Sequence, residues 1–157
     1  MKVSEAKKYL NGKTLVYTED LEYISDGNIV LHRSVFEKDK LDSYAKTIQT
    51  SSIIDKSKFE AVIPEKSPIE FKRSEYAKLA STTGVIYYNL DLGFYYYLNY
   101  LYYPILPESL FINEDYLDEK KYISPRFCDR NTRDESNFIF MPLRGNSRLI
   151  SDLFKLE

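Results

Sequence analysis

The stretch from Val85 to Leu106, VIYYNLDLGFYYYLNYLYYPIL, is the most apolar run of the chain, and a fold has to bury most of it. Eight of its 22 residues are tyrosines. Tyrosine buries a large ring while its hydroxyl reaches water or a polar partner. The run therefore predicts a core element with wet edges. The alternative is a tyrosine-lined groove for a base, a sugar or a peptide.

Two periodicities in this run predict different structures. A helix from Leu90 to Ile105 would bury one broad apolar face, with Asp91 as its N-cap and Pro104 as its end. That face would consist of Leu90, Phe94, Tyr97, Leu98, Leu101 and Ile105. A strand would instead place alternate residues from Leu90 to Tyr100 on one face, and aromatic residues favour strands. Because the run is long for a strand, its length favours the helix.

The same run does not predict a membrane span, although about 20 apolar residues are enough to cross a bilayer. Asn89, Asp91 and Asn99 would each need a polar partner in hydrocarbon, and tyrosine prefers the interface. The N-terminal residues MKVSEAKKYL lack the apolar core of a secretory signal. We therefore expect a cytoplasmic protein without a membrane partner.

Asp26-Gly27 is the strongest turn signal in the sequence. The pair lies between two short apolar segments, Glu22 to Ile24 and Ile29 to His32. Both central residues of a type I′ turn need positive φ, which Asp-Gly accommodates. We therefore expect a hairpin with Asp26 and Gly27 at the centre of its turn.

The other segments predict short helices and strands. Helices are expected at 5–10 (capped by Ser4), 34–48, 74–80, 114–121 and 147–156, and strands at 14–18, 52–54, 59–63, 69–72, 85–88 and 138–143. A chain of 157 residues suits one domain. We expect a single compact α+β domain over residues 1–157, with a small antiparallel sheet built from hairpins and several short helices packed on it. A C-terminal subdomain over 108–157 is the alternative division.

Cysteine and histidine each occur once, as Cys128 and His32, which excludes zinc sites built from those residues. The acidic residues between Glu114 and Glu119 match no calcium loop, and a solvated helix face explains them equally well. A lone histidine in a strand is more often structural than catalytic, and a lone cysteine is more often a small buried hydrophobe than a nucleophile. We therefore assign no catalytic residue, no metal and no cofactor.

Arginine is concentrated near the C-terminus, where five of seven arginines fall within the last 32 residues. They are Arg126, Arg130, Arg133, Arg144 and Arg148. Arginine offers a fork of donors that matches phosphate or carboxylate. Ser124-Pro125 predicts a helix start that would project the first three from one face, while Arg144 and Arg148 flank a glycine turn before a predicted helix. The alternative is local pairing with nearby acidic residues on a solvated surface.

These observations favour an interaction protein without enzymatic activity, whose partner is a protein or nucleoprotein complex. Tyrosine and arginine are enriched at binding hot spots. The expected partner-binding residues are the five C-terminal arginines together with Tyr95, Tyr97 and Tyr103. The residue usage suits an AT-rich source, so an inhibitor of a host machine encoded by a phage or mobile element is one hypothesis of this kind. The alternatives are a small nucleotide- or phosphoester-processing enzyme that uses His32 and the arginines, and an RNA- or single-strand-binding module that stacks bases on tyrosine.

Overall fold

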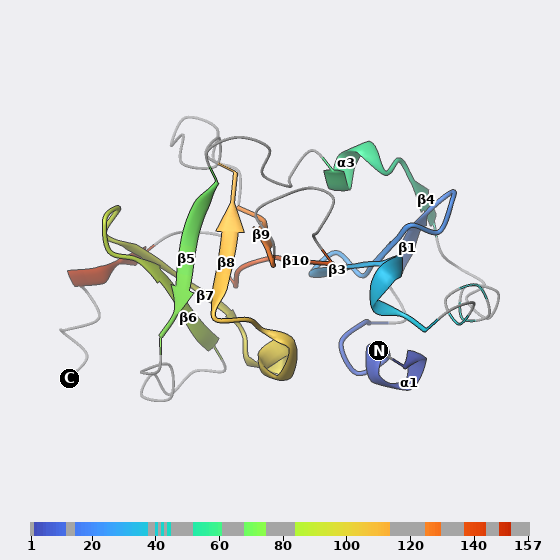
Figure 1. The fold of residues 1–157 in the computed structure, drawn as a ribbon, viewed down its shortest axis with the longest axis horizontal. Coiled ribbons are helices and arrows are strands. Elements are labelled where there is room, and N and C mark those ends of the chain that lie inside the picture. Colours follow the sequence, from blue (N-terminus) through green and yellow to red (C-terminus); the bar gives the residue numbers. More distant parts are fainter. Residues whose placement is uncertain are drawn as a thin grey trace.

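The protein is built mainly from sheet, as a computed structural model shows (Figure 1). The structure describes residues 2–11, 15–37, 40, 42, 44, 52–60, 68–74, 84–113, 125–129, 137–143 and 148–151. The strands are β1 (Val16–Thr18), β2 (Tyr23–Ser25), β3 (Ile29–His32), β4 (Ser52–Ile54), β5 (Ile69–Arg73), β6 (Gly84–Asn89), β7 (Phe94–Asn99), β8 (Ser109–Ile112), β9 (Phe127–Cys128), β10 (Phe138–Phe140) and β11 (Arg148–Leu149). The helices whose bounds lie within the described residues are α1 (Val3–Ala6), α3 (Ser57–Glu60) and the 3-10 helices η1 (Arg33–Val35) and η3 (Tyr100–Ile105).

The described strands form one 11-stranded sheet in the order β11-β7-β6-β5-β8-β9-β10-β3-β2-β1-β4. The sheet is mixed, because β4 pairs in parallel with β1 while the other described pairings are antiparallel. The prediction of a small antiparallel sheet covered by several helices was therefore wrong. Some segments whose sequence pattern predicted helices form strands instead. Most of the strands are too short to show a clear alternation of apolar and polar residues.

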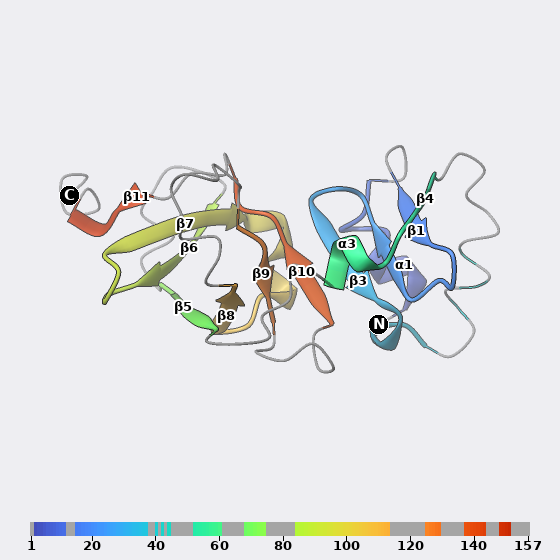
Figure 2. The ribbon, with the colours of Figure 1, turned by 90° about the horizontal axis from the view of Figure 1, so that it is seen from above.

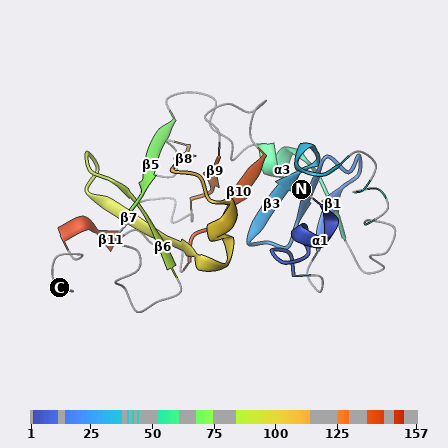
Figure 3. The same ribbon diagram turned by 60° about the horizontal axis from the view of Figure 1, so that its bottom comes forward.

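The chain crosses the sheet repeatedly, so that segments far apart in sequence lie side by side. β5 to β8 form one end of an elongated molecule, β1 to β4 with α1 form the other, and β9 and β10 lie between them (Figures 1, 2 and 3). β10 pairs with β3 on one side and with β9 on the other, which joins the two ends into one sheet. The described strands of residues 108–157 pair with strands of both ends, since β8 pairs with β5, β11 with β7 and β10 with β3.

The expected hairpin after Glu22 is present as β2 and β3, but its turn is shifted by one residue. Ser25 pairs with Val30, and the Asp26 N–H donates to the Ile29 carbonyl. Gly27 has a φ of 92°, whereas Asp26 and Asn28 do not have positive φ. The central residues of the turn are therefore Gly27 and Asn28, with glycine first, and the type I′ assignment was wrong.

The run from Val85 to Leu106 forms neither one long helix nor one long strand. β6 and β7 form a six-residue hairpin register from Gly84↔Asn99 to Asn89↔Phe94, followed by η3. Gly93, with a φ of 74°, lets the chain reverse between the strands. The preferred helix from Leu90 to Ile105 was wrong, and the strand alternative holds only for the part after this turn. The expected strand at 85–88 is confirmed as β6.

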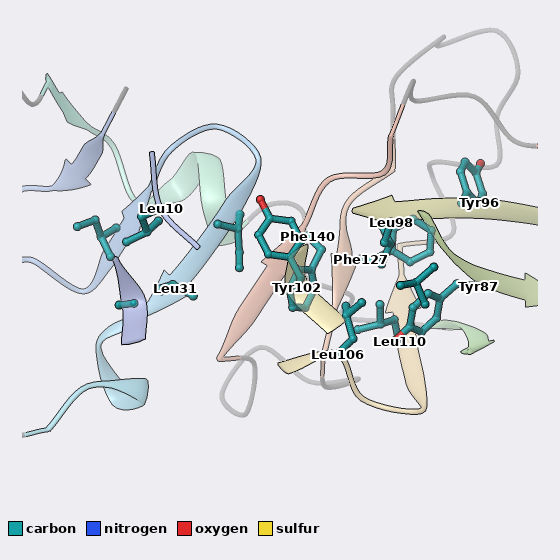
Figure 4. Packing of buried hydrophobic residues seen from close by; sticks show 14 of the residues in the cluster. Leu10, Leu31, Tyr87, Tyr96, Leu98, Tyr102, Leu106, Leu110, Phe127 and Phe140 are labelled. Carbon is teal, nitrogen blue, oxygen red and sulfur yellow. The ribbon is translucent and has the colours of Figure 1, made fainter. Parts of the chain in front are cut away.

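Both faces of β6 and β7 are covered, which explains why no polar alternation marks them as strands. Val85, Tyr87, Tyr96 and Leu98 belong to the main core, and Ile86 and Tyr95 are buried as well. The main core runs the length of the molecule. In Figure 4, Tyr102 and Phe140 lie between Leu10 and Leu31 on one side and Leu98 and Tyr87 on the other.

Several smaller predictions need correction. α1 is capped by Lys2 without a side-chain bond, so Ser4 is not its cap. Phe59 lies in α3 rather than in the strand expected at 59–63, and β4 pairs with β1. The strand expected at 69–72 is present as β5, an interior strand between β6 and β8. Arg148 and Leu149 form β11, where a helix was expected. The expected helices at 74–80 and 114–121, and most of those at 34–48 and 147–156, lie outside the described residues.

Candidate functional site

η3 is a six-residue 3-10 helix of about two turns that directly follows β7. The Asn99 side chain caps it by accepting a hydrogen bond from the Leu101 N–H, with 2.9 Å between Oδ1 and N. Pro104 lies inside the turn and fixes its own φ. The Leu106 N–H donates to the Tyr103 carbonyl and closes the turn. The tight 3-10 winding makes neighbouring side chains point in different directions.

Tyr102 points inward and anchors η3 in the core. Tyr102 is 3% exposed, and its ring packs against Tyr9, which follows α1, and Phe140 of β10, with ring centroids 6.3 and 5.6 Å away. Burial raises the pKa of Tyr102 to about 12, and the charge of Asp26 adds to the shift. Because the 3-10 winding turns neighbouring side chains in different directions, Tyr100 and Tyr103 face solvent when Tyr102 faces the core.

The outward side of η3 is apolar and aromatic. Tyr100 and Leu101 are each 50% exposed and Tyr103 is 40% exposed, and these are three of the five large hydrophobic side chains that are exposed among the described residues. Pro104 beside them is exposed too. We call these four residues, together with Arg73 of β5, the η3 surface. Scattered exposed hydrophobics are ordinary, whereas a group on one turn is typical of an interaction site.

Ring stacking and one arginine hold the η3 surface in place. Tyr100 and Tyr103 stack with centroids 5.2 Å apart and an angle of 16° between their planes. The Arg73 guanidinium carbon lies 5.3 Å from the Tyr103 ring centroid, in cation–π geometry. Arg73 Nη1 also donates to the Leu106 carbonyl at 2.9 Å. These contacts tie η3 to the interior strand β5 and reduce the freedom that binding would otherwise remove.

The three tyrosines expected to bind a partner have different positions. Tyr95 is 1% exposed and packs edge-to-face on half-buried Tyr97, with centroids 5.4 Å apart. The Tyr97 ring crosses Gly84, where an added Cβ would lie 2.8 Å from Cδ1 of the ring. Tyr103 is the member that belongs to the η3 surface. The sequence analysis did not identify Tyr100 or Arg73 as partner-binding residues. Arg73 is brought close to η3 by the pairing of β5 with β6, which the sequence alone does not reveal.

The expected arginine site is only partly within the described residues. Arg126 is half-buried just before β9, so the predicted helix across Phe127 and Cys128 was wrong, and helical spacing no longer aligns these arginines. Arg130, Arg133 and Arg144 lie outside the described residues. The backbone of Arg148 pairs with Tyr95, near the end of β7 that is remote from η3. A shared electropositive patch stays a prediction.

Cys128 and His32 have contrasting environments. Cys128 is fully buried, and burial raises the pKa of its thiol, which disfavours the nucleophilic thiolate. His32 is partly exposed and lies between the side chains of Glu22 and Ser34. Within the described part of the chain, no group of three or more His, Cys, Asp or Glu side chains is arranged to hold a metal ion.

No protein-family model matches the chain, and neither the curated proteins nor the solved structures include a significant match. Among the helices in the described ranges, none has the length and apolar character needed to span a lipid bilayer.

Proposed function

We propose that this protein is an interaction protein that binds a protein partner, free or within a nucleoprotein complex, through the η3 surface. The observation that carries the proposal is the exposed Tyr100–Tyr103 stack, which is joined by Leu101 and backed by Arg73. Tyrosine and arginine are the residues that most often dominate binding energy when an interface buries them.

The construction of the surface supports binding rather than simple packing. Tyr102 fixes η3 from the inside, and the Tyr87 hydroxyl donates to the Pro107 carbonyl just beyond it. Burial raises the pKa of Tyr87, so this hydroxyl stays a donor into the alkaline range, above the pH at which an ordinary tyrosine ionises. A rigid turn that already holds its aromatic side chains apart from the core loses little entropy when a partner covers them.

The charge of the chain favours a protein over a polyanion as the contacted surface. The formal net charge is −2, so no overall field attracts nucleic acid. On the η3 surface, Arg73 already donates to a backbone carbonyl and lies over Tyr103, which leaves an amphipathic aromatic face as the main contact. Such a face fits an apolar patch with a few polar acceptors on a partner protein.

The test compares two sets of exposed hydrophobic residues. Affinity capture from source-cell extract is carried out with the wild type, with the triple variant Tyr100→Ala, Leu101→Ala and Tyr103→Ala, and with the control Leu90→Ala. Leu90 is 72% exposed on the β6–β7 turn, outside the η3 surface. We expect the triple variant to capture at least ~10-fold less of a protein that the wild type and the control retain, since loss of a single hot spot costs about 2 kcal/mol or more.

Two controls make the result decisive. The midpoint of thermal unfolding should be nearly the same in all three proteins. The substituted side chains are at least half exposed, apart from Tyr103, which is 40% exposed, so they contribute little to the core. Nuclease treatment of the captured material should leave the partner band in place. Equal capture by the triple variant, or loss of all retained material after nuclease, would contradict the proposal, and the second result would point to a nucleic-acid ligand.

A further inference from the structure

Arg73 is a half-buried cation at the edge of the η3 surface. It is the last residue of β5 and pairs with Tyr87 of β6. Successive side chains of a strand point to opposite faces, so Arg73 shares a face with buried Phe71, while exposed Lys72 lies on the other face. The guanidinium extends from this core face to the ring of Tyr103 in η3.

Two contacts hold the guanidinium, and both are with neutral groups. Its carbon lies 5.3 Å from the Tyr103 ring centroid, and Nη1 donates to the Leu106 carbonyl at 2.9 Å. A guanidinium carries five N–H donors in a fixed planar fork, so this hydrogen bond uses only one of them. A ring and a carbonyl orient the group without cancelling its charge.

No carboxylate of the described residues forms an ion pair with Arg73. The ion pairs in this part of the chain are formed by other cations. Arg33, for comparison, binds Asp42 with 2.9 Å between Nη2 and Oδ2. Glu108 meets Arg73 through the backbone, where its carbonyl accepts from the Arg73 N–H at 2.8 Å. Within the described ranges, the half-buried guanidinium therefore lacks a compensating negative charge.

The exposed apolar groups of η3 lie directly beside this cation. Tyr100 and Tyr103 stack with centroids 5.2 Å apart, and Leu101 is 50% exposed next to them. The same surface thus presents a fixed positive charge and an aromatic face. A ligand that complements both needs a negative group and an apolar group side by side.

We propose that the η3 surface binds a segment of its protein partner in which an aspartate or glutamate pairs with Arg73 while a neighbouring apolar side chain packs on Tyr100 and Leu101. A carboxylate matches the planar donor fork of arginine and can form two parallel hydrogen bonds with it. This inference rests on the proposed function, because it names the chemistry of the segment that the same surface binds.

A single carboxylate fits this site better than a polyanion does. Lys72, the neighbouring cation of β5, lies on the opposite face, so the two charges do not combine into a stripe that follows a phosphate backbone. A partner that covers Arg73 excludes water and so strengthens the attraction between the two charges. Tyr103 and Leu106 already orient the guanidinium, which reduces the side-chain entropy that pairing removes.

The test begins with the selection of peptides. A phage-displayed library of short random peptides is selected on the full chain, and clones that also bind the triple variant Tyr100→Ala, Leu101→Ala and Tyr103→Ala are discarded. We expect the retained peptides to share an aspartate or glutamate close to a large apolar residue. One retained peptide is then synthesised in two forms, the acidic form and a form in which the acidic residue is replaced by its amide.

The affinities of the two peptides measure the Arg73 contact. Arg73→Gln should bind the acidic peptide about 10-fold or more weakly than the wild type does, because hydrogen bonds between charged groups are the stronger ones. The amide peptide should bind both proteins equally, which shows that the rest of the surface is intact in the variant. Arg73→Lys keeps the charge without the fork and should recover only part of the loss.

Lys72→Gln is the matched control. It removes the same charge from the neighbouring residue of β5, on the opposite face of the strand. Because an exposed charge outside the contact contributes little, its affinity for the acidic peptide should stay within about 2-fold of that of the wild type. An equal loss in Lys72→Gln and Arg73→Gln would reduce the effect to net charge and overturn the proposal.

The other outcomes separate this inference from the proposed function. The carboxylate is overturned, and the η3 surface is kept, if the retained peptides lack acidic residues or if the acidic peptide binds Arg73→Gln as tightly as the wild type. Enrichment of lysine or arginine also overturns it, and points to a cation on the Tyr100 ring. If no peptide distinguishes the wild type from the triple variant, the bound segment is overturned. The proposed function then fails only if capture from extract is also equal in both.

Discussion

The β2–β3 and β6–β7 hairpins have the same plan but different turns. In each, residues of one face enter the main core and residues of the other face are buried too. Carboxylate and hydroxyl groups close the first: Asp26 Oδ1 accepts from Asn28 N and Ile29 N at 2.9 and 3.1 Å, and Oδ2 accepts from Asn11 N at 2.9 Å. A single amide closes the second, where Asn89 Oδ1 accepts from Leu92 N.

The difference shows what each turn contributes. The buried carboxylate of Asp26 fixes the β2–β3 turn and also ties it to the chain after α1, whereas the β6–β7 turn projects into solvent with Leu90 exposed. Polar and aromatic surface groups lie at the other, open end of both hairpins. Glu22 and His32 flank the open end of the first, and η3 follows the open end of the second. The turns set the register, and the register positions those groups.

The largest expected effect tests whether the two hairpins share one core. Leu31 and Leu98 are both fully buried, one in each hairpin, and both belong to the main core. Leu31→Ala and Leu98→Ala should each lower the free energy of unfolding by about 2–5 kcal/mol. Urea unfolding followed by circular dichroism and by tyrosine fluorescence should show a single transition in both. Separate transitions, with each variant shifting only one, would show that the ends unfold independently.

The next effect contrasts the two turns. Asp26→Ala leaves three backbone N–H groups without their acceptor, and should destabilise by about 3 kcal/mol, since a buried unsatisfied donor costs about 1–3 kcal/mol. Asn89→Ala removes two bonds at the more exposed turn, from the Leu92 N–H to Oδ1 and from Nδ2 to the Glu70 carbonyl, and should cost about 1–2 kcal/mol. Chemical denaturation of both variants measures the difference. An equal loss in both would mean that the buried carboxylate has no special role.

A smaller effect should be the same in both turns. Gly27 and Gly93 have φ of 92° and 74°, and an added Cβ would meet nothing within 4 Å at either position. Gly27→Val and Gly93→Val should therefore each cost about 1–2 kcal/mol, because only the left-handed backbone conformation is penalised. Thermal unfolding measures both. An unchanged midpoint for Gly27→Val would show that the turn relaxes to another type without cost.

The smallest effect concerns alkaline pH and the tyrosine that lies between the two hairpins. Burial raises the pKa of Tyr102 to about 12, whereas an unfolded tyrosine ionises near pH 10. Above about pH 10 the unfolded state therefore loses protons first, and this contribution to stability declines as the pH rises toward 12. Between pH 10 and 12 the free energy of unfolding should fall less steeply with pH in Tyr102→Phe than in the wild type. A steeper loss in the variant would reverse the sign of this contribution.

The sequence by itself determined where the chain turns between Glu22 and His32. Asp, Gly and Asn at the turn act through their own backbone and nearest neighbours, so local chemistry predicts the hairpin even though its exact centre moved by one residue. The sequence also identified Val85 to Tyr88 as an interior strand, since such a short apolar run is suited to burial on both faces.

Only the tertiary structure decided what the following residues become. Because both faces of β7 are covered, Tyr95, Tyr96 and Leu98 are all buried, and the alternation that distinguishes strand from helix is missing. The exposure of Tyr100 and Tyr103 depends on Tyr102, which packs between Tyr9, in the turn after α1, and Phe140 of β10. The contact of Glu22 with His32 depends on the β2–β3 register, and that of Ser34 with Asn137 spans 103 residues of sequence. Contacts of this kind have no local signature, because the packing of the whole sheet brings the residues together.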